Sequence, residues 1–459
     1  MSLHDVVRSM AMAWVLVVAM GQAGADKPSG APAEDAAEPR PVTVASAAEL
    51  NAALKSATSG QVILLAPGEY GSVSIGKAQF DQPVTVRSAD RAKPATISHL
   101  RLRDCRNVVF DGLVLMRGKQ VADNSYYALV DAGGLDHVTF GHCRFVGATI
   151  SQGNQAGYGS GFGIKTRGQC KGLVIRRCVM TNLNKALSTG GTEGLRIEQN
   201  VIHDYRQDAF YVSGRDMVIA DNLVLDPRPY SLPRGKGDHP DFLQGYALRD
   251  VVIRDNFFRG GHSQGVFIHG SAPRQKADPN VGNVTIVNNV IYTYMRNALI
   301  VDRLPRSTIA HNVVLEHSDR MPYRVGVISA NGKAGDGVVV EYNIAENVAA
   351  DNKSTDDAPA VTYRHNIKVQ RADADAEKYY GAVFVNALAD EKATLRDFAL
   401  KPGPLAERDP RPGVDLDQFD WLKMTGLDQP DHEMHPLWLQ LDEAGRAKVR
   451  AVIGAEPRD

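Results

Sequence analysis

The sequence predicts an all-β protein: a right-handed parallel β-helix solenoid with an N-terminal cap helix and a mostly irregular or helical C-terminal tail. Six segments share one frame, in which a short alternating strand leads to a polar corner ending in Asn and then to two apolar residues; the corner residues are Asn200, Asn222, Asn256, Asn289, Asn312 and Asn343. Cys143 and Cys178 occupy the Asn position in two earlier segments, and the steps from Cys143 onward are 35, 22, 22, 34, 33, 23 and 31 residues. A basic coil of about 22 residues with variable insertions is typical of a solenoid.

The short strands themselves argue for stacking. A strand of three to five residues cannot bury its apolar face alone, so about nine or ten coils must stack into a continuous core. Alternation such as Leu195 and Ile197 around Arg196 predicts one face in that core. We expect each corner Asn to take a left-handed backbone conformation and to bond the same Asn one coil away. A β-propeller would need about four strands per 40 to 45 residues and other turn signatures.

The N-terminal residues 1–25 have the features of a secretory signal. Arg8 supplies the positive start, the run from Met10 to Met20 is apolar, and Ala23-Gly-Ala25 fits a cleavage site. That run of 11 residues is short of the about 20 that span a bilayer. Residues 26–42 are rich in Pro, Ala and charge and are expected to be a disordered linker. We therefore expect a periplasmic or secreted protein with no membrane span after signal cleavage.

The rest of the chain divides in two. We expect the β-helix to occupy residues 43–405 and a tail, residues 406–459, to pack on the solenoid or cap it. Leu439–Ile453 is expected to be one amphipathic helix of that tail. A capped solenoid of this length needs no partner subunit, so a monomer is expected.

Charge and cysteine usage narrow the partners. The 52 basic and 53 acidic residues nearly cancel, and there is no basic stripe, so nucleic-acid binding is not expected. Cys143 and Cys178 share a slot on neighbouring coils, about 4.8 Å apart, which suits either a disulfide or two stacked thiols. Cys105 and Cys170 lie in another slot, two coils apart and too far to bond. No Cys/His spacing suggests zinc.

Three segments carry a family resemblance. The Asn-Val-Ile coils resemble the β-helix superfamily of secreted pectate-lyase-like and polysaccharide-degrading proteins. Residues 45–70 resemble the N-terminal cap helix and first coil of alginate- and chondroitin-type lyases, and Leu395–Pro404 resembles their last coil. The resemblance covers residues 43 to about 405 and implies the fold, with no lyase subfamily motif intact.

The second strand of each coil aligns into columns. The third column is apolar and should face inward: Leu129, Ile164, Leu187, Phe210, Leu243, Phe267 and Leu299. The fourth then faces outward and contains Lys165, Ser188, Tyr211 and Gln244, and Arg167, Ser213 and Tyr246 follow two positions later. These residues predict a polar and aromatic strip along the axis, with His269 at its edge.

Two long insertions are expected to wall this strip. Residues 148–160 contain several glycines and Tyr158, and residues 226–240 contain Tyr230, Arg234, Asp238 and His239. Long loops on a rigid scaffold are the usual place for binding and catalysis. A walled groove suits an extended polymer, so we expect an acidic polysaccharide substrate, with Gln244, Tyr246, Ser188, Arg234, Tyr158 and His269 as substrate-binding residues.

The densest chemistry lies around Asp241, which shares a column with Asp208 and Lys185. We expect His203, Arg206, Asp238 and His239 nearby. The functional interpretation is a general base or a Ca²⁺ site of Asp208, Asp238 and Asp241. The structural alternative is that Asp208 and Asp241 cap turns and Lys185 pairs with them.

Three functions fit this strip. The leading hypothesis is a lyase that cleaves a uronic-acid polysaccharide by β-elimination, with Lys165, Arg167, Tyr211, Asp208, His239 and Asp241 as catalytic candidates; a uronate epimerase would share most of this machinery. The second is a glycoside hydrolase that uses Asp208 with Asp238 or Asp241. The third is a non-catalytic carbohydrate-binding or scaffold protein. Elimination is preferred because basic residues, and not acids alone, face the groove.

Overall fold

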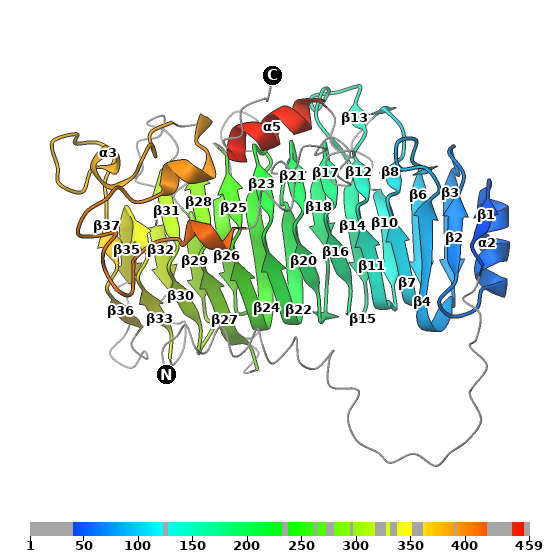
Figure 1. Cartoon of the computed structure of the whole chain (residues 1–459), viewed down its shortest axis with the longest axis horizontal. Coiled ribbons are helices and arrows are strands. Elements are labelled where there is room, and N and C mark those ends of the chain that lie inside the picture. Colours follow the sequence, from blue (N-terminus) through cyan, green and yellow to red (C-terminus); the bar gives the residue numbers. More distant parts are fainter. Residues whose placement is uncertain are drawn as a thin grey trace, which may run out of the picture. The chain divides into compact units, whose positions relative to one another are not determined.

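The computed structural model describes residues 40–122, 127–231, 237–260, 264–271, 280–293, 297–316, 327–330, 337–350, 361–389, 392–419 and 443–453. Arg234 and the predicted signal segment lie outside these residues. The described strands stack in parallel into a β-helix (Figure 1), as the sequence predicts.

Each full coil contributes a strand to each of three faces. Face 1 contains β3 (Ser72–Gly76), β6 (His99–Arg103), β10 (Ala128–Gly133), β14 (Phe162–Arg167), β18 (Lys185–Ser188), the first parts of β22 (Phe210–Ala220) and β24 (Asp241–Arg254), β26 (Gln264–His269), β29 (Leu299–Asp302), β32 (Val327–Ala330) and β35 (Asn347–Ala350).

Face 2 contains β1 (Val42–Val44), β2 (Val62–Leu65), β4 (Gln79–Ser88), β7 (Arg106–Asp111), β11 (Asp136–Gly141), β16 (Val174–Arg176), β20 (Arg196–Glu198), the second parts of β22 and β24, β27 (Gly282–Val287), β30 (Thr308–Ala310), β33 (Val339–Glu341) and β36 (Thr362–Arg364). Faces 1 and 2 form one continuous sheet because β22 and β24 run through both. Residues with positive φ, such as Asp216 (55°) and Asp250 (54°), mark the bend.

Face 3 is an 11-stranded sheet. It contains β5 (Thr96–Ile97), β8 (Val114–Met116), β12 (Arg144–Val146), β17 (Val179–Thr181), β21 (Val201–His203), β23 (Leu223–Leu225), β25 (Phe257–Arg259), β28 (Val290–Thr293), β31 (Val313–Glu316), β34 (Ile344–Ala345) and β37 (Ile367–Lys368). With one strand per coil, the described residues form at least the eleven coils of this face, slightly more than the nine or ten expected.

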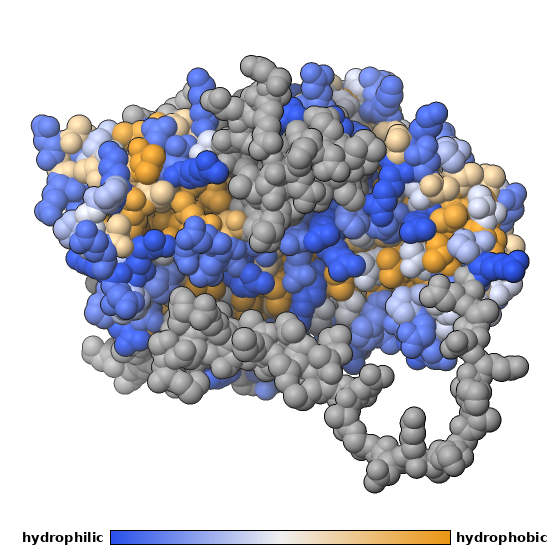
Figure 2. Space-filling model, in the orientation of Figure 1, coloured by the Kyte–Doolittle hydropathy of each residue, from blue (hydrophilic) through white to orange (hydrophobic). Residues whose placement is uncertain are grey.

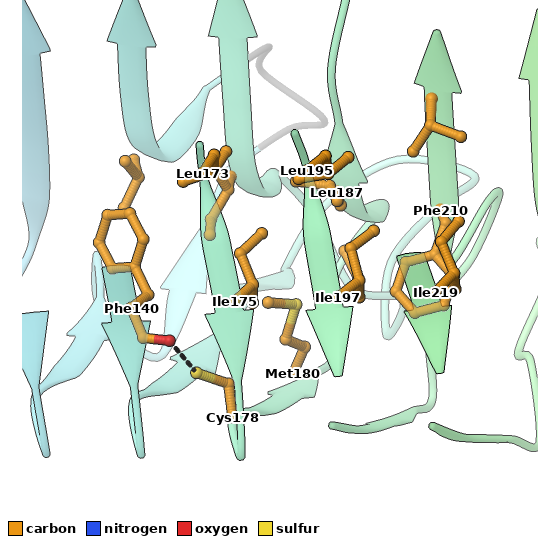
Figure 3. Packing of buried hydrophobic residues seen from close by; sticks show 14 of the residues in the cluster. Phe140, Leu173, Ile175, Cys178, Met180, Leu187, Leu195, Ile197, Phe210 and Ile219 are labelled. Atoms are coloured by element: carbon orange, nitrogen blue, oxygen red, sulfur yellow. Dashed lines mark hydrogen bonds between the residues drawn. The ribbon is translucent and has the colours of Figure 1, made fainter. Parts of the chain in front are cut away.

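The core consists of like residues stacked from coil to coil. Ile175, Ile197 and Ile219 are in register on three successive strands and are buried (Figure 3). Because each apolar side chain contacts its equivalents above and below, a single coil's short strand becomes part of a continuous apolar column. On the side of the molecule drawn in Figure 2, hydrophilic residues predominate and hydrophobic residues show between them.

The Asn ladder forms as predicted and is one residue longer. Each Asn side-chain nitrogen donates to the side-chain oxygen of the next Asn at 2.9–3.0 Å, from Asn200 through to Asn366. The expected left-handed conformation is misplaced by one residue: the residue before each Asn has the positive φ, for example Gln199 (58°) and Asp221 (54°). This arrangement turns the chain before the Asn and leaves the Asn backbone N–H to donate to the next Asn oxygen, as Asn222 does to Asn256 at 3.0 Å.

The cysteines of the same column are free thiols. Cys143 and Cys178 take the ladder position on neighbouring coils, and their sulfurs donate to carbonyl oxygens instead of forming a disulfide. Cys178 Sγ lies 3.4 Å from Phe140 O (Figure 3), and Cys143 Sγ lies 3.3 Å from Gly141 O. Burial raises the pKa of the Cys143 thiol well above its usual value, which keeps the sulfur protonated as a donor. Cys105 and Cys170 are two coils apart, as expected.

The predicted cap helix is α2 (Ala47–Ser56). Ser46 Oγ accepts a hydrogen bond from Glu49 N at 3.2 Å, and Leu50 and Leu54 bury their side chains against the first coils. A side-chain cap of this kind satisfies one of the free N–H groups at the start of a helix. No helix among the described residues is long and apolar enough to cross a membrane.

The C-terminal part of the prediction needs correction. Leu395–Phe398 is a 3-10 helix, η3, rather than the last coil; the last described strand is β37. Phe398 contacts Phe257 at a tilt and Tyr292 edge to face on face 3, at 5.9 and 5.0 Å between ring centroids. Helix α5 (Glu443–Ile453) also lies against the side of the stack, where Lys448 pairs with Asp204 at 3.0 Å. Helices η3 and α5 therefore cover face 3 and do not continue the solenoid.

We expect Asn256→Ala to lower the free energy of unfolding by about 3 kcal/mol, because it leaves several buried groups without partners at about 1–3 kcal/mol each. Asn256 accepts from Asn222 and donates to Asn289 and to Ile219 O. Asn366→Ala, at the half-buried end of the ladder, should cost about 1 kcal/mol. Urea unfolding of both variants measures the contrast, and equal losses would show that ladder position does not matter.

Candidate functional site

The outer side of face 1 carries the predicted strip. Ile164, Leu187, Phe210 and Leu243 pair in register and are buried. Lys165, Ser188, Tyr211 and Gln244 pair in register on the neighbouring column and are half-buried. Ser213, Tyr246 and His269 form the next outward column, and Arg167 lies at the same level two coils earlier.

Two rows of the predicted alignment are wrong by one residue. Val130, and not Leu129, pairs with Ile164, and Val266, and not Phe267, pairs with Leu243. In both rows two apolar residues are adjacent, so alternation could not choose between them. The correction adds Asp131 and Phe267 to the outward column.

An ion pair lies at the centre of the strip. Lys185 Nζ contacts Asp208 Oδ2, and the ammonium lies 4.6 Å from the centroid of the Tyr211 ring. The Asp208 side chain is only 3% exposed and that of Lys185 is 15% exposed. Burial raises the pKa of Asp208, and the Lys185 charge opposes that rise. The alignment of coils predicted that Lys185 lies beside Asp208, but it gave Lys185 no catalytic or binding role.

Asp241 is buried next to this pair. Its side chain is 0% exposed, and within the described residues neither carboxylate oxygen has a hydrogen-bond partner. Burial, and then the Asp208 charge, raises the pKa of Asp241 to about 8, against the influence of Lys185. Asp241 is therefore neutral at pH 7, and Lys185 and Asp208 balance each other.

His239 is an exposed group beside this buried cluster. Its Nδ1 lies 3.9 Å from Asp241 Oδ1, and its side chain is 66% exposed. The other ring nitrogen, Nε2, is 2.5 Å from Gln264 Nε2. Gln264 occupies the column of Asp241 on the next coil, so a buried amide holds a solvent-facing imidazole above the two carboxylates.

Aromatic side chains continue the strip along the axis. The rings of Tyr211 and Tyr246 are 5.5 Å apart, and Tyr246 stacks on His269 at 5.3 Å. Burial raises the pKa of Tyr246 to about 12, with Tyr211 as the next contribution, so this phenol keeps its proton. Asp302, which the sequence did not single out, lies 3.4 Å from His269 Nδ1.

The other end of the strip is basic. Arg167 Nε lies 3.4 Å from Asp131 Oδ1, and Arg103 takes the second oxygen of Asp131 at 3.1 Å. The Lys165 ammonium lies 4.8 Å from the centroid of the Phe162 ring. Burial, followed by the charge of Arg167, lowers the pKa of Lys165.

The two long loops meet instead of standing apart as walls. Arg206, only 1% exposed, donates two hydrogen bonds to Asp238, at 2.7 and 2.9 Å, and one to Gly159 O at 3.3 Å. Tyr158 and Tyr230 then contact edge to face at 5.4 Å. This buried Arg ties the loop of residues 148–160 to that of residues 226–240.

Asp238 is consequently engaged by Arg206, and the expected Ca²⁺ set of Asp208, Asp238 and Asp241 does not come together. In the part of the chain that the structure describes, no group of three or more His, Cys, Asp or Glu side chains is placed to hold a metal ion. His203 is also outside the cluster. Its Nδ1 lies 2.7 Å from Asp204, on the side of the stack where Lys448 binds.

A separate hollow of about 570 Å³ lies at the bend between faces 1 and 2. Its lining includes Arg215 and Glu193, which pair with each other at 2.5 Å. None of the predicted site residues lines it. We place the candidate site on the strip because titratable groups with shifted pKa values and half-buried aromatic rings occur together there.

No family model and no curated protein matches the chain. Among solved structures, it is similar to an alginate lyase from Paenibacillus sp. (14% identity, 71% of this chain and 99% of that one, TM-score 0.38). A mannuronic acid specific polysaccharide family 6 lyase from human gut microbiota (13%, 91% and 100%, TM-score 0.38) and a lacto-N-biosidase from Eubacterium ramulus (10%, 70% and 64%, TM-score 0.36) are also similar. These likenesses are too distant to assign an activity.

We expect Asp241→Asn to change how stability depends on pH. Between about pH 4, where an unfolded Asp titrates, and the folded pKa of about 8, the folded state binds one proton more than the unfolded state. Wild-type stability therefore falls as pH rises, by about 1.4 kcal/mol per pH unit from this group. Asp241→Asn lacks this contribution, so its stability relative to wild type should grow across that range. Urea unfolding at several pH values tests this; a constant difference would contradict the raised pKa.

The buried Arg206–Asp238 pair gives a second prediction. Asp238→Ala leaves a buried guanidinium without its carboxylate and should lower the free energy of unfolding by about 3–5 kcal/mol. Asp81→Ala is the control, because it removes a carboxylate that is 90% exposed and pairs with Arg106 at the surface. The control should cost no more than about 1 kcal/mol. Thermal unfolding compares the two, and similar shifts would mean that the loop pair is not structurally important.

Proposed function

We propose that the strip on face 1 binds a uronate-containing polysaccharide and cleaves it by β-elimination, outside the cytoplasm. The observation that supports this proposal is that cationic, phenol and imidazole side chains reach the surface of the strip and the carboxylates do not. Two of the proposed substrate contacts, Lys165 and Tyr211, are half-buried, and Arg167 and His239 are exposed. The side chains of Asp208 and Asp241, in contrast, are only 3% and 0% exposed. Cations, a phenol and an imidazole therefore meet the substrate.

Elimination at a uronate needs three contributions. A positive charge at the carboxylate must acidify the C5 proton, a base must remove that proton, and an acid must protonate the leaving oxygen. In our proposal Lys165 and Arg167 bind the carboxylate. Tyr211 first gives its own proton to solvent, and the Lys185 ammonium over its ring stabilises the phenolate. The phenolate then takes the C5 proton and becomes neutral. His239, whose side chain is 66% exposed, gives a proton to the leaving oxygen.

The buried carboxylates act indirectly in this scheme. Asp208 holds Lys185 beside Tyr211. A neutral Asp241 leaves the cluster without net negative charge, so an anionic substrate is not repelled. Hydrolysis by the same two carboxylates is less well supported, because neither reaches the surface where a glycosidic bond would lie.

The test is incubation with a panel of acidic and neutral polysaccharides, with Ca²⁺ and with chelator, while ultraviolet absorbance and reducing ends are followed together. Unsaturated uronate absorbance is the expected result. Reducing ends without absorbance would indicate hydrolysis instead. An exchange of the C5 hydrogen with solvent, with neither signal, would indicate epimerisation, and silence in all three would favour a binding protein.

Variants then test the assigned roles. Tyr211→Phe should lower kcat by at least about 100-fold, because general base catalysis contributes about 10²–10⁴-fold. Arg176→Gln, which changes an exposed residue on face 2 two coils earlier, should leave activity unchanged. A Tyr211→Phe variant with wild-type kcat would remove Tyr211 from the mechanism.

The pKa of Asp241 gives this function a pH dependence. Above about pH 8 the carboxyl loses its proton and places a negative charge under the strip, so KM for an anionic polymer should rise. Asp241→Asn should abolish that rise while the rest of the pH profile persists. An unchanged KM profile in the variant would show that Asp241 does not control substrate binding.

A further inference from the structure

A hollow of about 370 Å³ opens on face 1, on the N-terminal side of the strip. Its lining comes from successive strands β3, β6, β10 and β14 and from the segment after β8; it includes Ser72, His99, Arg117, Tyr127, Lys165 and Arg167. The volume lies toward the small end of the range for ligand pockets, about 300–1,000 Å³, and gives room for one sugar residue.

Among the described residues that line this hollow, positive side chains outnumber negative ones. Arg117, Lys165 and Arg167 line it, and Arg103 lies just behind. Asp131 is the single acidic residue among the lining residues of this hollow, and it already contacts both Arg103 and Arg167. The described lining therefore contains three cationic side chains and one carboxylate, a composition that suits an anionic ligand.

Aromatic rings hold two of the cations in place. The Arg117 guanidinium lies 4.8 Å from the centroid of Tyr127, and Lys165 lies at the same distance from Phe162. The Tyr127 hydroxyl is itself anchored by hydrogen bonds to Ser160, at 3.1 and 3.2 Å. The cations are thus positioned against fixed rings, which lowers the entropy lost when they bind an anion.

We propose that this hollow binds one anionic sugar residue, whose carboxylate or sulfate contacts Arg117, beside the reacting uronate whose carboxylate Lys165 and Arg167 bind. The hollow directly precedes the coil of Lys185, because Lys165 pairs in register with Ser188. Each coil advances the axis by about 4.8 Å, so a polymer lying along face 1 reaches both sites at once. If the proposed function holds, the substrate is a chain that carries negative charge on neighbouring sugars, rather than an isolated uronate between neutral ones.

Binding of monosaccharides tests the hollow independently of any cleavage. Glucuronate, galacturonate and mannuronate, each beside its neutral parent sugar, are measured by saturation-transfer NMR with the full-length protein. We expect a signal for at least one uronate and none for its neutral parent. Arg117→Gln should weaken that binding about tenfold, as loss of one charge-assisted hydrogen bond predicts. Arg176→Gln, an exposed Arg on face 2, is the matched control and should bind as wild type does.

The outcomes separate clearly. Absence of a uronate signal in wild type, equal binding of the neutral sugars, or equal binding by Arg117→Gln and Arg176→Gln would each overturn the proposal. Displacement of the uronate by inorganic sulfate would show that charge alone is recognised, which supports an anion site for either a carboxylate or a sulfate ester. Resistance to sulfate would support a site for the sugar carboxylate.

A monosaccharide has no glycosidic bond to break, so failure of the polysaccharide assay and failure of this binding test are distinguishable. Where cleavage is observed, Arg117→Gln should raise KM about tenfold for the acidic polymer and leave kcat unchanged, since Arg117 lies outside the reacting centre. A fall in kcat with unchanged KM would contradict a role in binding the neighbouring sugar.

Discussion

The register between stacked coils is the constraint on which the rest of the structure depends. The Asn ladder enforces it, because each buried amide finds its acceptor in the equivalent amide one coil away and its backbone N–H finds the same oxygen. A slip of one residue would leave these polar groups unpaired in the core and turn each apolar column toward solvent. Loops of very different length can therefore be inserted between coils while the columns on face 1 stay aligned.

That alignment is what gathers the candidate site. Lys185, Asp208 and Asp241 are 23 and 33 residues apart in the chain, yet they lie on consecutive coils. Lys185 and Asp241 begin the face 1 strands β18 and β24, and Asp208 lies two residues before β22. Burying two carboxylates side by side is costly unless their charge is compensated. One ammonium compensates one of them. Burial, followed by the Asp208 charge, raises the pKa of the second, Asp241, to about 8, so that carboxyl keeps its proton at pH 7. The buried cluster of Lys185, Asp208 and Asp241 is thus close to neutral, and the N-terminal end of the strip carries the cations Lys165 and Arg167.

Local periodicity explains how much the sequence could predict. The repeated Asn frame predicted the coils, and alternation predicted the outward column of Lys165, Ser188, Tyr211 and Gln244. It failed where neighbouring residues are both apolar, as at Leu129 and Val130, and it missed Asn366 because polar residues surround it in the last coil. The sequence predicted that Arg206 and Asp238 both lie near Asp241 but not that they pair with each other. This contact joins a corner to a loop 32 residues later and follows no repeat. For the same reason the expected Ca²⁺ ligands do not meet: Asp208 pairs with Lys185, and Asp238 pairs with Arg206 between the two loops.

The C-terminal segment explains why a ligand would use face 1. The outer side of face 3 is apolar, with Val179, Val201, Leu223, Phe257 and Val290 in one buried cluster. Such a stripe cannot stay in water without a cover, and residues such as Tyr380, Phe398 and Val449 supply it. The C-terminal segment therefore packs on face 3, where Arg259 donates to Ala393 O at 3.1 Å and Tyr292 donates to Ala387 O at 2.8 Å. Face 1 instead carries half-buried polar and aromatic side chains that tolerate water, so it can remain open and still exchange that water for an extended, charged chain.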